Sequence, residues 1–127
     1  MKEVRYMDTN YYIIPYRLAI PATHLEAKAD DWTVTYRFVK NSTALYESCI
    51  PIQVLRLHAN LYHQMKNNEY GAHEPCGWSD AWVDDDNIVH YSLSPKAPEA
   101  VISMETLRLH AAISTAILPQ LWLVPPA

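Results

Sequence analysis

Alternation of polar and apolar residues predicts strands in the first third of the chain. In residues 32–39, WTVTYRFV, aromatic residues and valine alternate with Thr and Arg, and a period of two residues is typical of a half-buried strand. Residues 11–20, YYIIPYRLAI, are β-branched and aromatic but contain Pro15. Proline cannot donate to a ladder, so this segment predicts an edge strand or a bent strand. We interpret residues 21–31 as a connector.

Two segments instead have the period of an α-helix. Residues 51–66 begin with Pro51, which is tolerated in a first turn because its missing N–H has no partner there, and a second helix is expected over residues 101–118, stopped by Pro119. One face of the first helix is apolar, as expected for a helix that packs on a core. That face is formed by Ile50, Val54, Leu57, Leu61 and Met65.

The segment between these helices predicts a hairpin. Residues 81–83 and 88–94 have strand character, and Asp84–Asn87 between them are turn residues. Residues 95–100, PKAPEA, form a linker, and residues 120–124, QLWLV, are a candidate last strand.

The pentapeptide LRLHA occurs twice, at residues 55–59 and 107–111, and indicates an internal duplication. VTYRF and VHYSL precede the two copies, and AWV and LWLV follow them, so each half reads as strand–helix–strand. The pseudo-repeats span about residues 32–83 and 88–124. They predict one α+β domain over residues 1–127, with two helices on a mainly antiparallel sheet in the ferredoxin-like order β-α-β-β-α-β and an extra N-terminal strand.

Each copy of the repeat places a histidine beside a buried helix face. The helical period puts the leucines of LRLHA inward, Arg56 and Arg108 outward, and His58 and His110 at the margin of the apolar arc. Two interpretations follow. The histidines are core-edge residues hydrogen-bonded to a strand tyrosine such as Tyr36 or Tyr91, or they are a pair that transfers protons.

Composition and charge exclude several classes of protein. The chain has only two glycines, so phosphate-binding glycine loops are absent. Its formal net charge is −4, and residues 67–95 carry six acids with no Lys or Arg, which argues against nucleic-acid binding. No apolar run reaches the roughly 18–20 residues that cross a bilayer. With two cysteines and no signal-peptide pattern, the sequence predicts a cytoplasmic protein that does not bind membranes.

The sequence contains no metal-site or cofactor motif. His73 and Cys76 form one H-x-x-C fragment without a second pair, and the acidic turn at residues 84–87 lacks the alternating oxygens of an EF-hand. We therefore predict no metal and no cofactor.

The main functional signal is the segment from residue 69 to residue 86, which combines acids with Trp and Tyr. Aromatic faces attract cations and carboxylates supply negative charge, so this composition suits a cationic partner. The predicted binding residues are Glu69, Tyr70, Glu74, Trp78, Asp80, Trp82, Asp84, Asp85 and Asp86.

The sequence thus favours a non-enzymatic protein that binds a basic protein or an organic cation. Because a sheet covered on one side leaves its other face open, a homodimer is also expected. The alternative is a small cofactor-independent enzyme, an isomerase or a monooxygenase, with a pocket between sheet and helices. Its candidate catalytic residues are His58, His110, Tyr36 and His90.

Overall fold

The computed structural model describes residues 3–6, 9–66, 80–92 and 96–122. They form two helices and two antiparallel sheets, so the α+β class is confirmed. No helix in these four ranges is long and apolar enough to cross a membrane. The elements are β1 (Glu3–Tyr6), β2 (Thr9–Ile14), β3 (His24–Ala29), β4 (Thr33–Lys40), β5 (Thr43–Pro51), α1 (Ile52–Lys66), β6 (Asp80–Val83), β7 (Ile88–Ser92), β8 (Ala100–Ser103) and α2 (Met104–Trp122).

The chain divides into two compact units, each with its own sheet. The five-stranded unit comprises Met1–Leu55 and Ala112–Ala127, and the three-stranded unit comprises Arg56–Ala111. Each helix contributes residues to both units. That the whole chain behaves as one domain stays a prediction.

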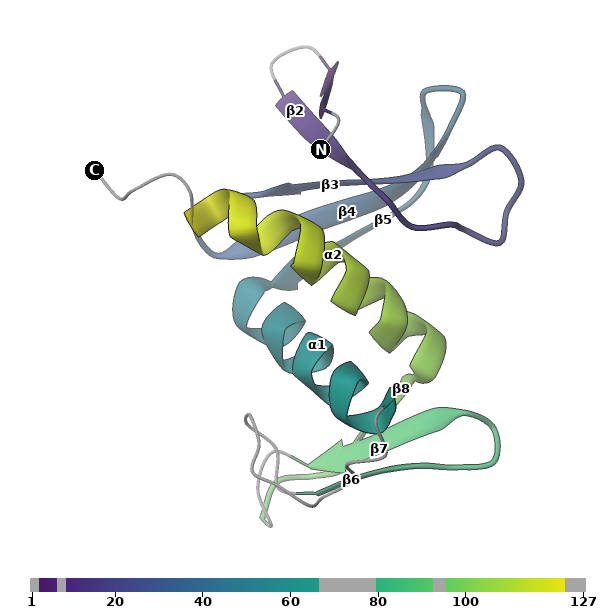
Figure 1. Ribbon diagram of the computed structural model, residues 1–127, viewed down its shortest axis with the longest axis vertical. Helices are drawn as coiled ribbons and strands as arrows, with labels where there is room; N and C mark the ends of the chain where they lie inside the picture. The colour runs from purple at the N-terminus through teal and green to yellow at the C-terminus, as the bar shows by residue number, and fades with distance from the viewer. Residues whose placement is uncertain (1–2, 7–8, 67–79, 93–95, 123–127) are drawn as a thin grey trace. The chain divides into compact units, whose positions relative to one another are not determined.

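The five-stranded unit is an antiparallel meander in the order β1-β2-β3-β4-β5 (Figure 1). Its buried residues include Leu25 on β3 and Val34 on β4, both 0 % exposed. The C-terminal half of α2 lies beside this sheet (Figure 1) and contributes Ile113 and Ile117, which are also buried. Apolar residues of strands and helix therefore build this core.

The three-stranded unit packs the sheet β6-β7-β8 against helix residues (Figure 1). Leu61 and Met65 of α1 and Leu107 of α2 form a buried cluster with Ala81 of β6 and Val89 of β7. Because strand residues alternate in direction, the inward face of this sheet is covered by the cluster and the other face points away from it.

Several sequence predictions are confirmed. The helix expected over residues 51–66 is α1, although Pro51 ends β5 and does not lie in the first helical turn. The strand expected over residues 32–39 is β4, and the predicted hairpin is formed by β6 and β7. Leu55 and Leu107 are fully buried. Arg56 and Arg108 are exposed, so the orientation predicted for LRLHA is confirmed in both copies.

Other predictions need correction. The connector expected over residues 21–31 contains β3, which was missed because Glu, Lys and Ala are depleted in strands. Residues 43–51 form β5 ahead of α1, residues 101–103 belong to β8 and not to a helix, and the extra strand expected over residues 11–20 is β2, which ends before Pro15. Gln120–Trp122 are helical and not a strand, because α2 continues through Pro119 at the loss of one backbone hydrogen bond.

The ferredoxin-like order and the internal duplication are not confirmed. The strands lie in two separate sheets, each a meander of sequential neighbours, and a helix follows each sheet. The prediction of strand–helix–strand repeats placed one strand on each side of a helix. In the structure, consecutive strands pair as hairpins instead, because antiparallel strands need only a short connection.

Candidate functional site

The predicted acidic-aromatic segment lies only partly within the described residues. Its first part falls outside them (Glu69, Tyr70, Glu74 and Trp78). The remaining predicted residues belong to β6 or to the turn that joins β6 to β7 (Asp80, Trp82, Asp84, Asp85 and Asp86).

A row of side chains crosses the outer face of the three-stranded sheet. Trp82 of β6 pairs with His90 of β7, and His90 pairs with Val101 of β8. Their neighbours Ala81 and Val89 belong to the buried cluster, so this row points away from the core. The two residues that flank His90 are exposed, Trp82 at 46 % and Val101 at 60 %. The row is therefore an open surface with an aromatic and an aliphatic end.

His90 is held between two carboxylates. Its Nε2 lies 2.7 Å from Oδ2 of Asp84, and its Nδ1 lies 2.7 Å from Oε1 of Glu99. A carboxylate only accepts hydrogen bonds, so both contacts are satisfied only when both ring nitrogens carry a proton. The imidazole also lies parallel to the indole of Trp82, with the ring centres 4.1 Å apart. The arrangement is that of an imidazolium clamped by two acids beneath an exposed indole.

The β6–β7 turn positions one of those acids. Oδ1 of Asp84 accepts hydrogen bonds from the backbone N–H groups of Asp86, at 2.9 Å, and Ile88, at 3.1 Å. Asn87 adopts a left-handed conformation with φ of 64°, which asparagine tolerates better than most residues. The DDDN sequence thus orients the Asp84 carboxylate, leaving Oδ2 to meet His90.

The electrostatics of the site follow from these contacts. The hydrogen bond from His90 and then that from the Ile88 N–H lower the pKa of Asp84. Asp84 and then Glu99 raise the pKa of His90. Asp85 and Asp86 are exposed beside them. Two carboxylates therefore hold one imidazolium, and the two further acids of the turn keep the net charge of this segment negative when His90 is protonated.

Replacing Asp84 with asparagine should lower the pKa of His90. Asparagine keeps the oxygen that accepts from the turn amides but removes the charge that favours imidazolium. A raised folded pKa means that His90 stabilises the hairpin below its unfolded pKa of about 6.5 and that this contribution is lost as the pH rises through the folded pKa. Titration of the His90 ring signals by NMR measures the change. Asp85→Asn is the control, and an equal drop in that variant would contradict the assigned contact.

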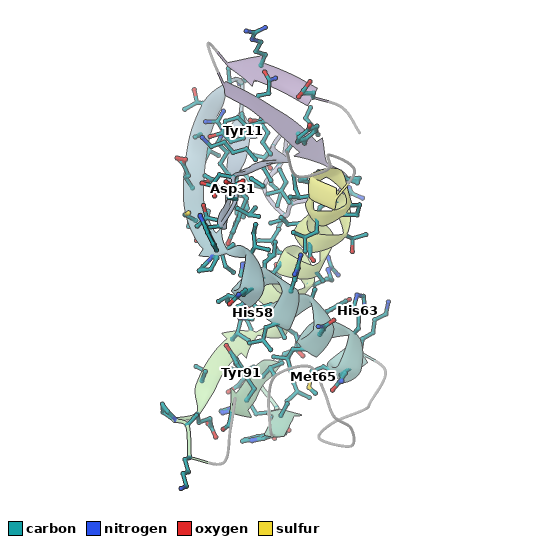
Figure 2. All side chains as sticks on the ribbon, turned by 90° about the vertical axis from the view of Figure 1, so that its left-hand side faces the viewer. Tyr11, Asp31, His58, His63, Met65 and Tyr91 are labelled. Atoms are coloured by element: carbon teal, nitrogen blue, oxygen red, sulfur yellow. The ribbon has the colours of Figure 1, made fainter. Side chains whose placement is uncertain are left out.

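The two histidines of the LRLHA repeats meet within the three-stranded unit. Nδ1 of His58 lies 2.8 Å from Nδ1 of His110, and Nε2 of His58 lies 3.4 Å from the Tyr91 hydroxyl. Figure 2 shows His58 on α1 and Tyr91 on the adjacent sheet. Both histidines are 6 % exposed. The predicted interpretation as core-edge histidines bonded to a strand tyrosine therefore agrees with the contact to Tyr91.

Burial shifts the titration of this pair. It lowers the pKa of His58, and burial together with the charge of His58 lowers the pKa of His110 to about 4. Near neutral pH both rings are therefore uncharged. The other two residues of the enzymatic alternative lie elsewhere. His90 occupies the outer face of the sheet, and Tyr36 is a buried residue of β4 in the five-stranded unit.

Three residues of interest, one or two in each unit, were not predicted from the sequence. Val101 completes the outer row and Glu99 supplies one of the two carboxylates that hold His90, but both fall in segments interpreted as linker and helix. The pairing of β7 with β8 places Val101 beside His90, and the contact of Glu99 with His90 identifies the carboxylate. In the five-stranded unit Glu26 is 0 % exposed, although it occurs in a segment read as a connector. Nε2 of His24 lies 2.5 Å from one of its oxygens and Nε of Arg37 lies 3.2 Å from the other.

Within the described residues, no group of three or more His, Cys, Asp or Glu could hold a metal ion. The predicted fragment of His73 and Cys76 lies outside them.

Searches against family models, curated proteins and solved structures find no match to this chain. The function must therefore be argued from the geometry.

Proposed function

We propose that this protein binds a cationic partner, a basic protein or an organic cation, through the outer face of its three-stranded sheet. The observation that carries the proposal is the exposed indole of Trp82 beside the Asp84 and Glu99 carboxylates. An indole face attracts a cation, and nearby carboxylates add Coulomb attraction. The proposal also includes the predicted residues of the 69–78 segment, which lie outside the described residues.

The arrangement of the site suits binding more than catalysis. One face of the Trp82 ring is covered by His90, which holds the indole in a defined orientation. Preorganised aromatic residues are frequent anchors of interfaces because little conformational entropy is lost when they bind. The acids of the turn would accelerate encounter with a basic partner, and salt would weaken this effect.

Binding to defined cations tests the proposal. We expect immobilised nona-arginine and nona-lysine peptides to capture the protein at low salt, and choline to be the probe for an organic cation. Trp82→Ala should weaken capture about tenfold or more, as expected for an interface anchor. Asp85→Asn with Asp86→Asn should weaken it and flatten its salt dependence. The affinity is measured by surface plasmon resonance at two ionic strengths.

The matched control removes two acids elsewhere, Asp31→Asn in the β3–β4 turn and Glu105→Gln in the first turn of α2, both exposed. An equal loss of binding in this control would show that the net charge of the protein, and not the position of Asp85 and Asp86, accounts for the weaker binding. Failure of all three probes to bind, or full binding by Trp82→Ala, would overturn the proposal.

The enzymatic alternative is favoured by one observation, the contact between His58 and His110. A neutral imidazole near neutral pH is able to act as a general base. Burial of both rings weighs against it, because a substrate has to reach at least one of them. The binding series should also include His110→Asn. The binding proposal expects unchanged capture in that variant, and a loss of capture would implicate the histidine pair and not the outer face.

The duplication remains part of the proposal, with a different repeating unit. LRLHA follows a hairpin in both copies: β4 and β5 run directly into α1, and β7 and β8 run directly into α2. VTYRF lies in β4 and VHYSL begins in β7, so the sequence similarity also aligns the first strands. We infer a duplicated hairpin–helix unit. Homodimerisation stays a separate proposal, tested by the mass of the protein in solution.

A further inference from the structure

The contact between His58 and His110 has a geometry that restricts its protonation. The two rings are parallel within 5°, with centres 5.0 Å apart. The distance between parallel planes cannot exceed the distance between any two of their atoms, so these planes are at most 2.8 Å apart. Stacked rings stand about 3.5 Å apart at van der Waals contact. The imidazoles therefore meet edge to edge, as in a hydrogen bond along the Nδ1–Nδ1 line.

An N–H···N hydrogen bond needs one protonated and one unprotonated nitrogen. Two arrangements satisfy this for the neutral pair. Either His58 donates from Nδ1 and its Nε2 accepts from the Tyr91 hydroxyl, or His110 donates from Nδ1 and Nε2 of His58 donates to the Tyr91 oxygen. A single added proton can be taken up at an Nε2 atom. When both rings are protonated, two N–H groups and two positive charges face each other at this contact.

Among the described contacts of His58, none supplies a negative charge that would balance protonation of its ring. Tyr91 of β7 is the titratable group in contact with His58, and burial raises its pKa, so it remains neutral and supplies no negative charge. The carboxylates of Asp84 and Glu99 bond His90 on the opposite face of the sheet. On α1 and α2, Arg56 and Arg108 are cationic and exposed. Burial lowers the pKa of both histidines, and the charge of His58 lowers that of His110 further.

We propose that His58 and His110 form an acid-sensitive latch, which joins the parts of α1 and α2 in the three-stranded unit and opens when both imidazoles are protonated. The sign follows from the titration. A histidine whose folded pKa lies below the unfolded value of about 6.5 binds more protons in the open state, so stability is present above pH 6.5 and lost as the pH falls toward 4. The latch is closed at neutral pH.

Two measurements on the full chain test the latch. The first is NMR of the imidazole nitrogens, which should show a scalar coupling between the two Nδ1 atoms at pH 7 and two depressed, mutually dependent titrations. The second is hydrogen exchange of the Val89 amide on β7, converted to an opening equilibrium constant at each pH. Between pH 7 and pH 4.5, protonation of His110 alone should raise this opening constant about 50-fold, if its pKa is about 4 in the closed state and about 6.5 in the open state.

His110→Asn is the decisive variant. The asparagine side chain places a non-titrating hydrogen-bonding group near the position of Nδ1, and the 50-fold contribution should disappear. His63→Asn, at an exposed position of α1, should keep the full dependence. Unchanged pH dependence in His110→Asn overturns the latch. If that variant does not fold, independent titration of both wild-type rings near pH 6.5 overturns it.

Discussion

Replacing Arg37 with alanine should lower the free energy of unfolding by about 3–5 kcal/mol, as expected when a buried carboxylate loses its partner. Arg37 of β4 pairs in register with Glu26 of β3, and its Nε lies 3.2 Å from the Glu26 carboxylate, which is fully buried. The guanidinium also lies over the ring of Tyr11, 3.9 Å from its centre. Removing it leaves His24 facing a buried charge and also removes a packing surface.

Chemical denaturation at pH 7 measures this effect. Arg17→Ala, at an exposed position of the same unit, is the control and should change stability by less than about 0.5 kcal/mol. The paired variant Glu26→Leu with Arg37→Met should recover most of the loss, because the charge and its partner are removed together. A loss below about 1 kcal/mol in Arg37→Ala would show that the ion pair is dispensable.

Replacing Leu107 with alanine should cost about 2–5 kcal/mol, the usual range for a buried leucine. Leu107 is 0 % exposed and packs with Val89 of β7 and Ala81 of β6, on the inward side of the strands that present Trp82 and His90. The cost combines lost burial with the cavity left behind.

Thermal and denaturant unfolding of Leu107→Ala, compared with Val101→Ala, test this second expectation. Val101 is 60 % exposed on the outer face of the same sheet, so its truncation should change stability by no more than about 0.5 kcal/mol. Equal effects of the two variants would mean that the inward and outward faces have been assigned incorrectly.

Local patterns explain the elements that were predicted correctly. The apolar stripe of α1 and the DDDN turn act over a few residues, and their geometry follows from helical period and turn chemistry. The strand β3 was missed because HLEAKA contains no β-branched or aromatic residue. It is held by antiparallel pairing with both β2 and β4, which no local pattern reports.

In the candidate site, too, some residues could be predicted from local sequence and others depend on strand pairing. Trp82 and Asp84 were expected from composition, because acids and aromatic residues cluster in that segment. Glu99 is nine residues from His90 in the sequence and meets it only because β8 pairs with β7. Its role therefore depends on strand register.

The sequence alone determines the periods of helix α1 and of strand β4, the turn between β6 and β7, the inward leucines of LRLHA and the uneven distribution of charge. All of these depend on residues a few positions apart. Tertiary structure decides that His58 meets His110 edge to edge across 52 positions, that Glu26 is buried against Arg37, and that Trp82, His90 and Val101 share one open face. The physical reason is that register and helix rotation are set by the packing of whole faces.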